Sequence, residues 1–215
     1  MAASQTIADS KRAFHQAFPH VIAPLYRRLA DELLVELHLL SHQSQFEANE
    51  LFSVGLCAVF DTFTKGYRPE AQTDALFSAL CSSNGFDAEH LRSTNASLIE
   101  QAKGKDLDSL KSWLSSYSLK DGLHYSRLMA VGLMRLVQTS AADATSSDNA
   151  ALVQQSKDLA EGLGLPSDRV EKDVTLFGSN SERMDQAVEL VKETIAAEKR
   201  KKERRLAEQA QGSSN

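Results

Sequence analysis

Leucines recur at intervals of four or three residues near the start of the chain, and this spacing is the strongest constraint on its fold. They stand at Leu25, Leu29, Leu33, Leu37 and Leu40. Such intervals place side chains on one face of an α-helix. The chain also has only 10 glycines and 4 prolines in 215 residues, roughly half the usual share. An all-β protein needs more turns, and a nucleotide-binding fold needs more glycine, so we expect an all-α multi-helix bundle.

Capping residues mark where the helices should begin. The side chains of Ser, Thr, Asp and Asn accept hydrogen bonds from the free N–H groups of a first turn, and proline suits the first helical position. Residues 51–63 are apolar on nearly all sides, which predicts a buried central helix. Residues 125–136 predict a second, strongly apolar helix in the core. The expected starting residues are Thr6, Pro24, Asn49, Asp87 and Asp106.

The C-terminal third should contain two interruptions. Residues 140–149 are small and polar without periodicity, which predicts a loop. Gly178-Ser179-Asn180-Ser181 predicts the end of a short helix and the cap of a last one. We therefore expect a helical bundle domain at 1–178, a long charged helix at 179–210 and a disordered tail at 211–215.

The last helix combines a short apolar stripe with a basic run. The stripe, at Met184, Val188, Val191 and Ile195, has coiled-coil spacing over less than two heptads. Beyond it the helix has no apolar face. Its candidate interaction residues are Lys199, Arg200, Lys201, Lys202, Arg204 and Arg205.

Charge is distributed unevenly along the chain. The net charge is −5, yet residues 192–208 carry seven basic and four acidic side chains, a net charge of +3, which leaves −8 elsewhere. A basic segment of this kind suits an acidic protein surface or an anionic lipid surface; a solvated helix end is the alternative. Nucleic acid is not expected as a partner, because the acidic body would repel phosphates and no aromatic residue interrupts the basic run.

No catalytic constellation, cofactor motif or metal site is predicted. His38 and His42 share a helical face, as metal ligands do, but no third ligand accompanies them. Cys57 and Cys81 lie in apolar helical patterns, where buried free thiols are the usual state. A metalloenzyme using the two histidines remains an alternative hypothesis.

The sequence contains no apolar stretch of about 20 residues that could span a membrane. Its first residues, Met1 to Thr6, lack the basic and apolar regions of a secretory signal. We therefore expect a cytosolic protein that reaches membranes only peripherally or through a partner.

Several segments together resemble one family. They are DSKRAF at 9–14, YRRLADELLVELHLL at 26–40, FDTFTKGYRP at 60–69, LFSALC at 76–81 and YSRLMAVGL at 125–133. In this order they are similar to the thylakoid formation protein, also described as a photosystem II biogenesis factor, of cyanobacteria and chloroplasts. The resemblance covers nearly the whole chain. It is specific, because a helical bundle has no physical need for Lys-Gly-Tyr-Arg-Pro at one point.

The resemblance implies a non-enzymatic auxiliary factor of photosystem II biogenesis and repair and of thylakoid organisation. Members associate with the FtsH-type AAA+ membrane protease and help it accumulate, so this protease complex is the expected partner, with photosystem II assembly intermediates as further candidates. The absence of a transit peptide suggests a cyanobacterial member at the cytosolic face of the thylakoid. The Tyr67-Arg68-Pro69 corner is either a structural hinge or a contact point. Oligomeric state stays open, with a monomer as the working expectation.

Overall fold

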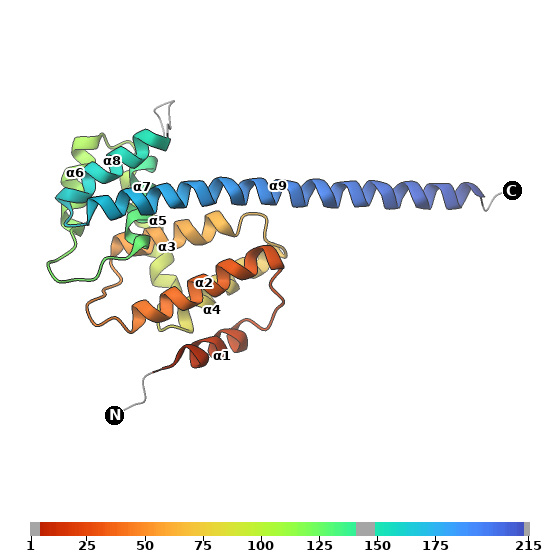
Figure 1. Ribbon diagram of the computed structural model, residues 1–215, viewed down its shortest axis with the longest axis horizontal. Helices are drawn as coiled ribbons and strands as arrows, with labels where there is room; N and C mark the ends of the chain where they lie inside the picture. The colour runs from red at the N-terminus through yellow and green to blue at the C-terminus, as the bar shows by residue number, and fades with distance from the viewer. Residues whose placement is uncertain (1–4, 141–148, 213–215) are drawn as a thin grey trace. The chain divides into compact units, whose positions relative to one another are not determined.

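The described part of the chain is built from helices joined by short connections (Figure 1). A computed structural model describes residues 5–140 and 149–212, with side chains as far as residue 205. The all-α expectation is confirmed. The elements are α1 (Ile7–Ala17), α2 (Pro24–Ser41), α3 (Glu50–Phe63), η1 (Glu70–Gln72), α4 (Thr73–Ser82), α5 (Ala88–Ala102), α6 (Leu107–Leu114), η2 (Ser115–Tyr117), α7 (Arg127–Ser140), α8 (Asn149–Gly162) and α9 (Ser167–Gly212).

The chain divides into two units, residues 1–178 and 179–215. The first unit holds α1 to α8 and the beginning of α9, and the second holds the remainder of α9. The predicted organisation, a helical bundle domain at 1–178 and a long charged helix at 179–210, remains a prediction.

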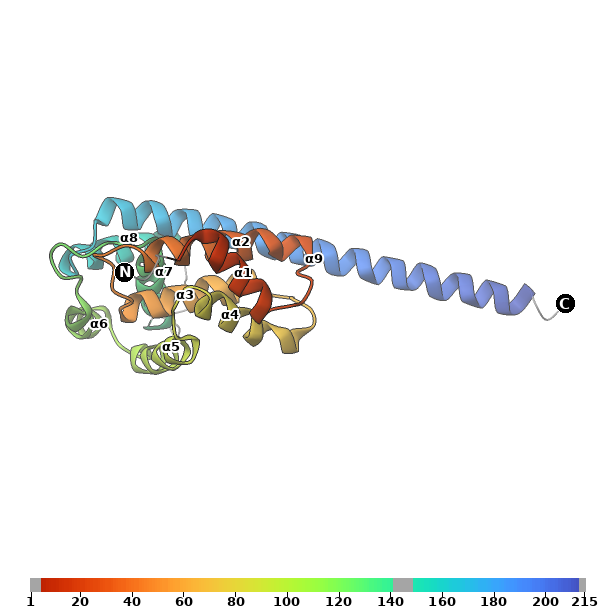
Figure 2. The ribbon, with the colours of Figure 1, turned by 90° about the horizontal axis from the view of Figure 1, so that it is seen from below.

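Helix α3 forms the centre of the first unit. It makes its most extensive contact with α7 and a second one with α5, an arrangement visible in Figure 2. A Cβ atom on Gly55 would lie 1.7 Å from the backbone oxygen of Leu128, and one on Gly132 would lie 2.0 Å from that of Leu51. The two backbones thus touch where both helices lack a side chain. The expectation that these segments are buried helices of the core is confirmed.

The buried face of α2 differs from the one that its leucine spacing suggests. Leu33, Leu37 and Leu40 are buried, whereas Leu25 and Leu29 are only half-buried. Tyr26 and Ala30 take the buried positions at the start of the helix. The buried face is therefore rotated by about one residue in the first turns.

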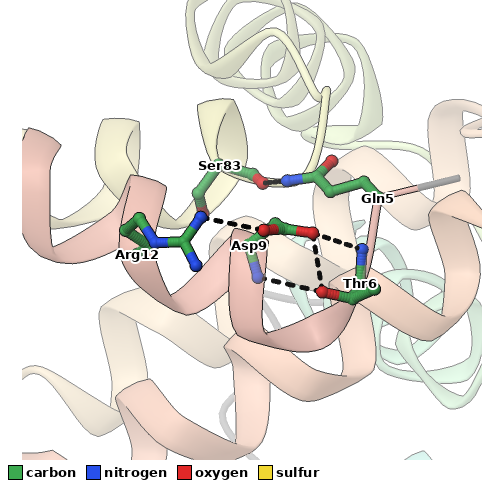
Figure 3. Close-up of polar contacts among 5 residues, drawn as sticks. All are labelled: Gln5, Thr6, Asp9, Arg12 and Ser83. Carbon is green, nitrogen blue, oxygen red and sulfur yellow. Dashed lines mark hydrogen bonds and ion pairs between the residues drawn. The ribbon is translucent and has the colours of Figure 1, made fainter. Parts of the chain in front are cut away.

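Helix α1 is tied to the bundle by the residue that precedes its N-cap. Thr6 and Asp9 cap each other reciprocally, and Arg12 pairs with Asp9 at 2.9 Å (Figure 3). The Gln5 amide donates to the backbone oxygen of Ser83 at the end of α4, at 2.9 Å. The cap predicted at Thr6 is confirmed, and the bond from Gln5 holds the N-terminal end of α1 at the end of α4.

The other predicted helix starts are also confirmed. The side chains of Asn49, Asp87 and Asp106 accept hydrogen bonds from backbone N–H groups three residues on, at 2.9, 3.0 and 2.7 Å. Pro24 occupies the first turn of α2. Each cap satisfies an N–H that the helix itself leaves without a partner.

The predicted helix break at Gly178-Ser179-Asn180-Ser181 is wrong, because α9 continues through these residues for a total of 46 residues. Glycine inside a helix costs only about 1 kcal/mol relative to alanine, and neighbouring turns readily offset this. Gly178 also makes room for a neighbour: a Cβ here would lie 3.0 Å from Asn149 Nδ2.

Two further expectations concern residues outside the described part. The predicted loop at 140–149 coincides with residues 141–148, which lie outside the described part, between α7 and α8. Of the predicted tail at 211–215, only residues 211 and 212 are described, as the last residues of α9.

The Lys65-Gly66-Tyr67-Arg68-Pro69 corner joins α3 to η1 and packs locally. Gly66 takes a positive φ of 75°, which glycine adopts without strain. The buried ring of Tyr67 meets that of Tyr26 edge-on, at 5.1 Å, and the Tyr26 hydroxyl donates to Lys65 O at 3.0 Å. These contacts hold the corner against α2 and support the structural-hinge interpretation.

Candidate interaction surfaces

The predicted basic segment, residues 199–205, lies entirely within α9. All its side chains are exposed. Successive residues of a helix are rotated by about 100°, so the six cations point around the full circumference. The segment can therefore present positive charge in any direction around the helix axis. It contains Lys199, Arg200, Lys201, Lys202, Arg204 and Arg205.

Apolar side chains precede the basic segment by about one to two and a half turns. Leu190, Val191 and Ile195 are 64%, 44% and 60% exposed. Combined with the cations that follow, they make this part of α9 an amphiphilic helix, apolar first and basic afterwards. Such a sequence of properties suits contact with a surface that is both apolar and negatively charged.

His38 and His42 lie together as the sequence predicts, with ring centroids 4.3 Å apart. His38 Nδ1 makes a 2.9 Å hydrogen bond with the hydroxyl of Ser10, which is buried on α1. Partial burial, and secondly the neighbouring His42, lower the pKa of His38. Within the described residues, no group of three or more His, Cys, Asp or Glu side chains could hold a metal ion.

Both cysteines are buried and free, as predicted. Burial raises the pKa of the Cys57 thiol to about 11 and that of the Cys81 thiol to about 12. The nucleophilic form of cysteine is the thiolate, which is scarce at neutral pH when the pKa is this high. These thiols are therefore part of the apolar core rather than reactive groups.

A polar network joins α2, α7 and the start of α9, and no sequence pattern predicted it. Arg127 donates twice to the Glu36 carboxylate, at 2.9 and 2.6 Å. The Tyr125 hydroxyl donates to Asp173 at 2.7 Å, and the Arg169 guanidinium lies 5.2 Å from the Tyr125 ring centroid. The hydrogen-bonded partners are 91 and 48 residues apart in sequence, so no local signal could have revealed them.

Burial and hydrogen bonding shift the pKa values of Tyr125 and Arg127 in this network. Burial, followed by the hydrogen bond to Asp173, raises the pKa of Tyr125. The hydrogen bonds from Arg127 to Glu36 raise the pKa of Arg127 against the opposing effect of burial. Tyr125 therefore stays a neutral donor and Arg127 a cation throughout the physiological pH range.

Two hollows adjoin this network. One, of about 680 Å³, follows the outer face of α2 past Val35 and Leu39, and the other, of about 490 Å³, lies beside Tyr125, Arg169 and Lys172. In the described residues, no helix is long and apolar enough to cross a membrane.

Comparison with known proteins gives a consistent result. The family model described as thylakoid formation protein matches residues 6–206. The chain is 84% identical to Protein Thf1 of Synechococcus sp. (strain CC9605) over 215 residues, which cover 100% of both chains. It is 38% identical to Protein Thf1 of Synechococcus elongatus, over 94% of this chain and 86% of that one.

A solved structure of Psb29 has the same fold. Its TM-score is 0.80 at 35% sequence identity, and the match covers 92% of this chain and 98% of Psb29. Family, relatives and fold thus agree over nearly the full length. The chain belongs to the thylakoid formation protein family.

Proposed function

We propose that this chain is a non-enzymatic auxiliary factor in photosystem II biogenesis and repair and in thylakoid organisation. In this role it binds and stabilises an FtsH-type AAA+ membrane protease complex at the cytosolic face of the thylakoid. The observation that carries the proposal is the family match over residues 6–206. The buried, protonated cysteines and the engaged His38 fit a binding protein better than an enzyme.

We assign the basic segment of α9 as the first candidate for the protease contact. Six exposed cations that surround a helix form a strong attractant for an acidic protein surface. Such contacts speed association and confer specificity more than they add affinity, and salt weakens them. Photosystem II assembly intermediates are secondary partners in this proposal.

An affinity pull-down from solubilised cyanobacterial thylakoids tests the proposal. The baits are the full chain and a chain ending at Ala197, with mass spectrometry of the eluates. Recovery of FtsH-type subunits by both baits supports the partner and assigns its site to residues 1–197. Recovery by the full chain alone supports the basic segment, whereas recovery by neither contradicts the proposal.

Charge variants sharpen the result. Replacing the six cations of residues 199–205 by glutamine should abolish recovery if their charge makes the contact. The matched control is the double variant Glu198→Gln and Glu203→Gln, which alters the same helix in the opposite electrostatic sense. If the control variant recovers as few FtsH-type subunits as the glutamine variant of the six cations, the contact does not depend on positive charge.

Peripheral binding to anionic thylakoid lipids through the same helix is a second candidate function. The exposed Leu190, Val191 and Ile195 favour it, because a helix that binds a lipid surface combines exposed apolar side chains with cations. Flotation with anionic and zwitterionic vesicles distinguishes this function. Binding only to anionic vesicles, lost at 1 M salt where the Debye length falls to ~3 Å, supports it; absence of binding at low salt contradicts it.

A further inference from the structure

A continuous groove runs along the outer face of α2 and ends beside the start of α9. The two hollows that form it share the residues Glu36, Leu40, His124 and Arg127, so they adjoin each other. The two hollows have volumes of about 680 and 490 Å³ and are open to solvent along their length.

The α2 part of the groove is apolar. Val35 and Leu39 are 38% and 63% exposed, and Leu40 lies buried beside them. The backbone groups of this stretch are engaged within α2 itself, so the wall offers no main-chain hydrogen bonds. Such a surface offers an alkyl chain apolar contact, and it offers an extended peptide none of the main-chain hydrogen bonds that a sheet edge would supply.

The other end of the groove is cationic. Arg169 and Lys172 line it, and neither forms an ion pair with a carboxylate among the described residues. This end holds three cations, Arg127, Arg169 and Lys172, and two carboxylates, so its net charge is +1. Of the carboxylates, Glu36 is paired with Arg127, and Asp173 accepts the Tyr125 hydroxyl. Arg169 and Lys172 are thus available to an anionic group that enters the groove.

Acidic residues set the direction of binding. Asp31 and Glu32 line the opposite end of the α2 hollow. Arg28 pairs with Glu32 at 2.7 Å, whereas Asp31 forms no ion pair among the described residues. A negatively charged group would be repelled there and attracted at Arg169 and Lys172. Charge and polarity together therefore select a ligand that has an apolar body and one anionic end.

We propose that this groove binds one amphiphilic anion. Its alkyl or acyl chain lies over Val35 and Leu39, and its single carboxylate, phosphate or sulfonate head lies between Arg169 and Lys172. The site consists of residues of the first unit only, so it shares no residue with the basic segment at 199–205 and does not depend on the function proposed for that segment.

Titration calorimetry with monomeric dodecanoate and dodecyl phosphate tests the site. Both should bind to the full chain at one site. Dodecyltrimethylammonium, which has the same chain and the opposite charge, and acetate, which has the head alone, should bind at least tenfold more weakly. Equal binding of dodecyltrimethylammonium or of the free-carboxylate peptide acetyl-Ala-Leu-Ala-Leu would overturn the proposal.

Variants locate the site. Leu39→Asp, and the double variant Arg169→Gln and Lys172→Gln, should each weaken dodecanoate binding at least tenfold. The controls Leu176→Asp and Lys11→Gln alter exposed residues outside the groove and should change affinity less than twofold. Unchanged binding in Leu39→Asp, with its fold verified by circular dichroism, would contradict the assignment.

Two further measurements test which unit forms the site and what kind of molecule fills it. A chain ending at Ala197 should bind dodecanoate as the full chain does, and loss of binding there would contradict a site formed by the first unit. Vesicles that contain phosphatidylglycerol distinguish the source of the ligand. Flotation that depends on Leu39, Arg169 and Lys172 indicates a membrane lipid, and binding of monomeric dodecanoate alone indicates a free fatty acid.

Discussion

At the scale of single residues, Gly55 and Gly132 determine how closely the two central helices approach. We expect Gly55→Ala to lower the free energy of unfolding by about 2–4 kcal/mol, because the new Cβ would overlap the Leu128 oxygen. Urea denaturation measures this. Gly162→Ala is the control, since a Cβ there would meet only the Lys111 side chain, at 3.8 Å. Equal stabilities of Gly55→Ala and the natural chain would show that α3 and α7 are not in backbone contact.

His38 should make stability depend on pH. Its pKa is lowered in the folded chain, so below the ordinary value of about 6.5 the unfolded chain binds the proton more readily. Stability should therefore fall as pH decreases through about 6.5, and level off below the folded pKa. In thermal melts from pH 7.5 to 5.5, His38→Gln should lose less stability than the natural chain. His90→Gln, at an exposed position, is the control; a pH response that is the same in all three chains would contradict the prediction.

The side chain of Asn49 should contribute measurably to the start of α3. It accepts the Phe52 N–H at 2.9 Å. Asn49→Ala should lower the free energy of unfolding by about 1 kcal/mol. Asn49→Asp should lower it by much less, because aspartate also accepts this hydrogen bond. Chemical denaturation of the two variants tests the cap. If both variants lose stability equally, the side-chain bond is not the cause.

At the scale of elements, the continuity of α9 through Gly178 is open to a direct test. Gly178→Pro should cost about 3 kcal/mol or more, since proline removes a helical hydrogen bond and clashes with the preceding turn. Gly178→Ala should be neutral or stabilising by up to about 1 kcal/mol, provided that the Asn149 side chain moves aside. Thermal unfolding with circular dichroism compares them. If Gly178→Pro is as stable as the natural chain, the result would support the helix break that the sequence pattern predicts.

At the scale of the whole molecule, stability and the basic segment should be separable. Every side chain from 198 to 205 is exposed, so deleting residues 198–215 removes no described buried surface. We expect the free energy of unfolding to change by less than about 1 kcal/mol, which corresponds to a Tm shift of at most about 2–4 °C for a chain of this size. Differential scanning calorimetry measures this shift. A larger loss of stability would mean that the segment packs as part of the fold.

Much of the fold was predictable because it rests on local chemistry. Each cap, such as Asn49 or Asp87, needs only residues three positions apart, and helical periodicity is visible in a single turn. The family, too, was recognisable from short motifs in order. The basic segment at 199–205 was likewise identifiable, because an uninterrupted run of charges has no face to bury.

Contacts between distant residues could be seen only in the folded chain. The sequence by itself determined the helices, their caps, the buried cysteines and the charged C-terminal run, because these depend on neighbours within about one turn. The tertiary structure decided which helices touch, at Gly55 and Gly132, and that Gly178 does not end α9. Only the tertiary structure brought Glu36, Arg127 and Arg169 to one groove, because these residues are far apart in the chain. Whether a charge there is paired depends on the neighbours that the fold supplies.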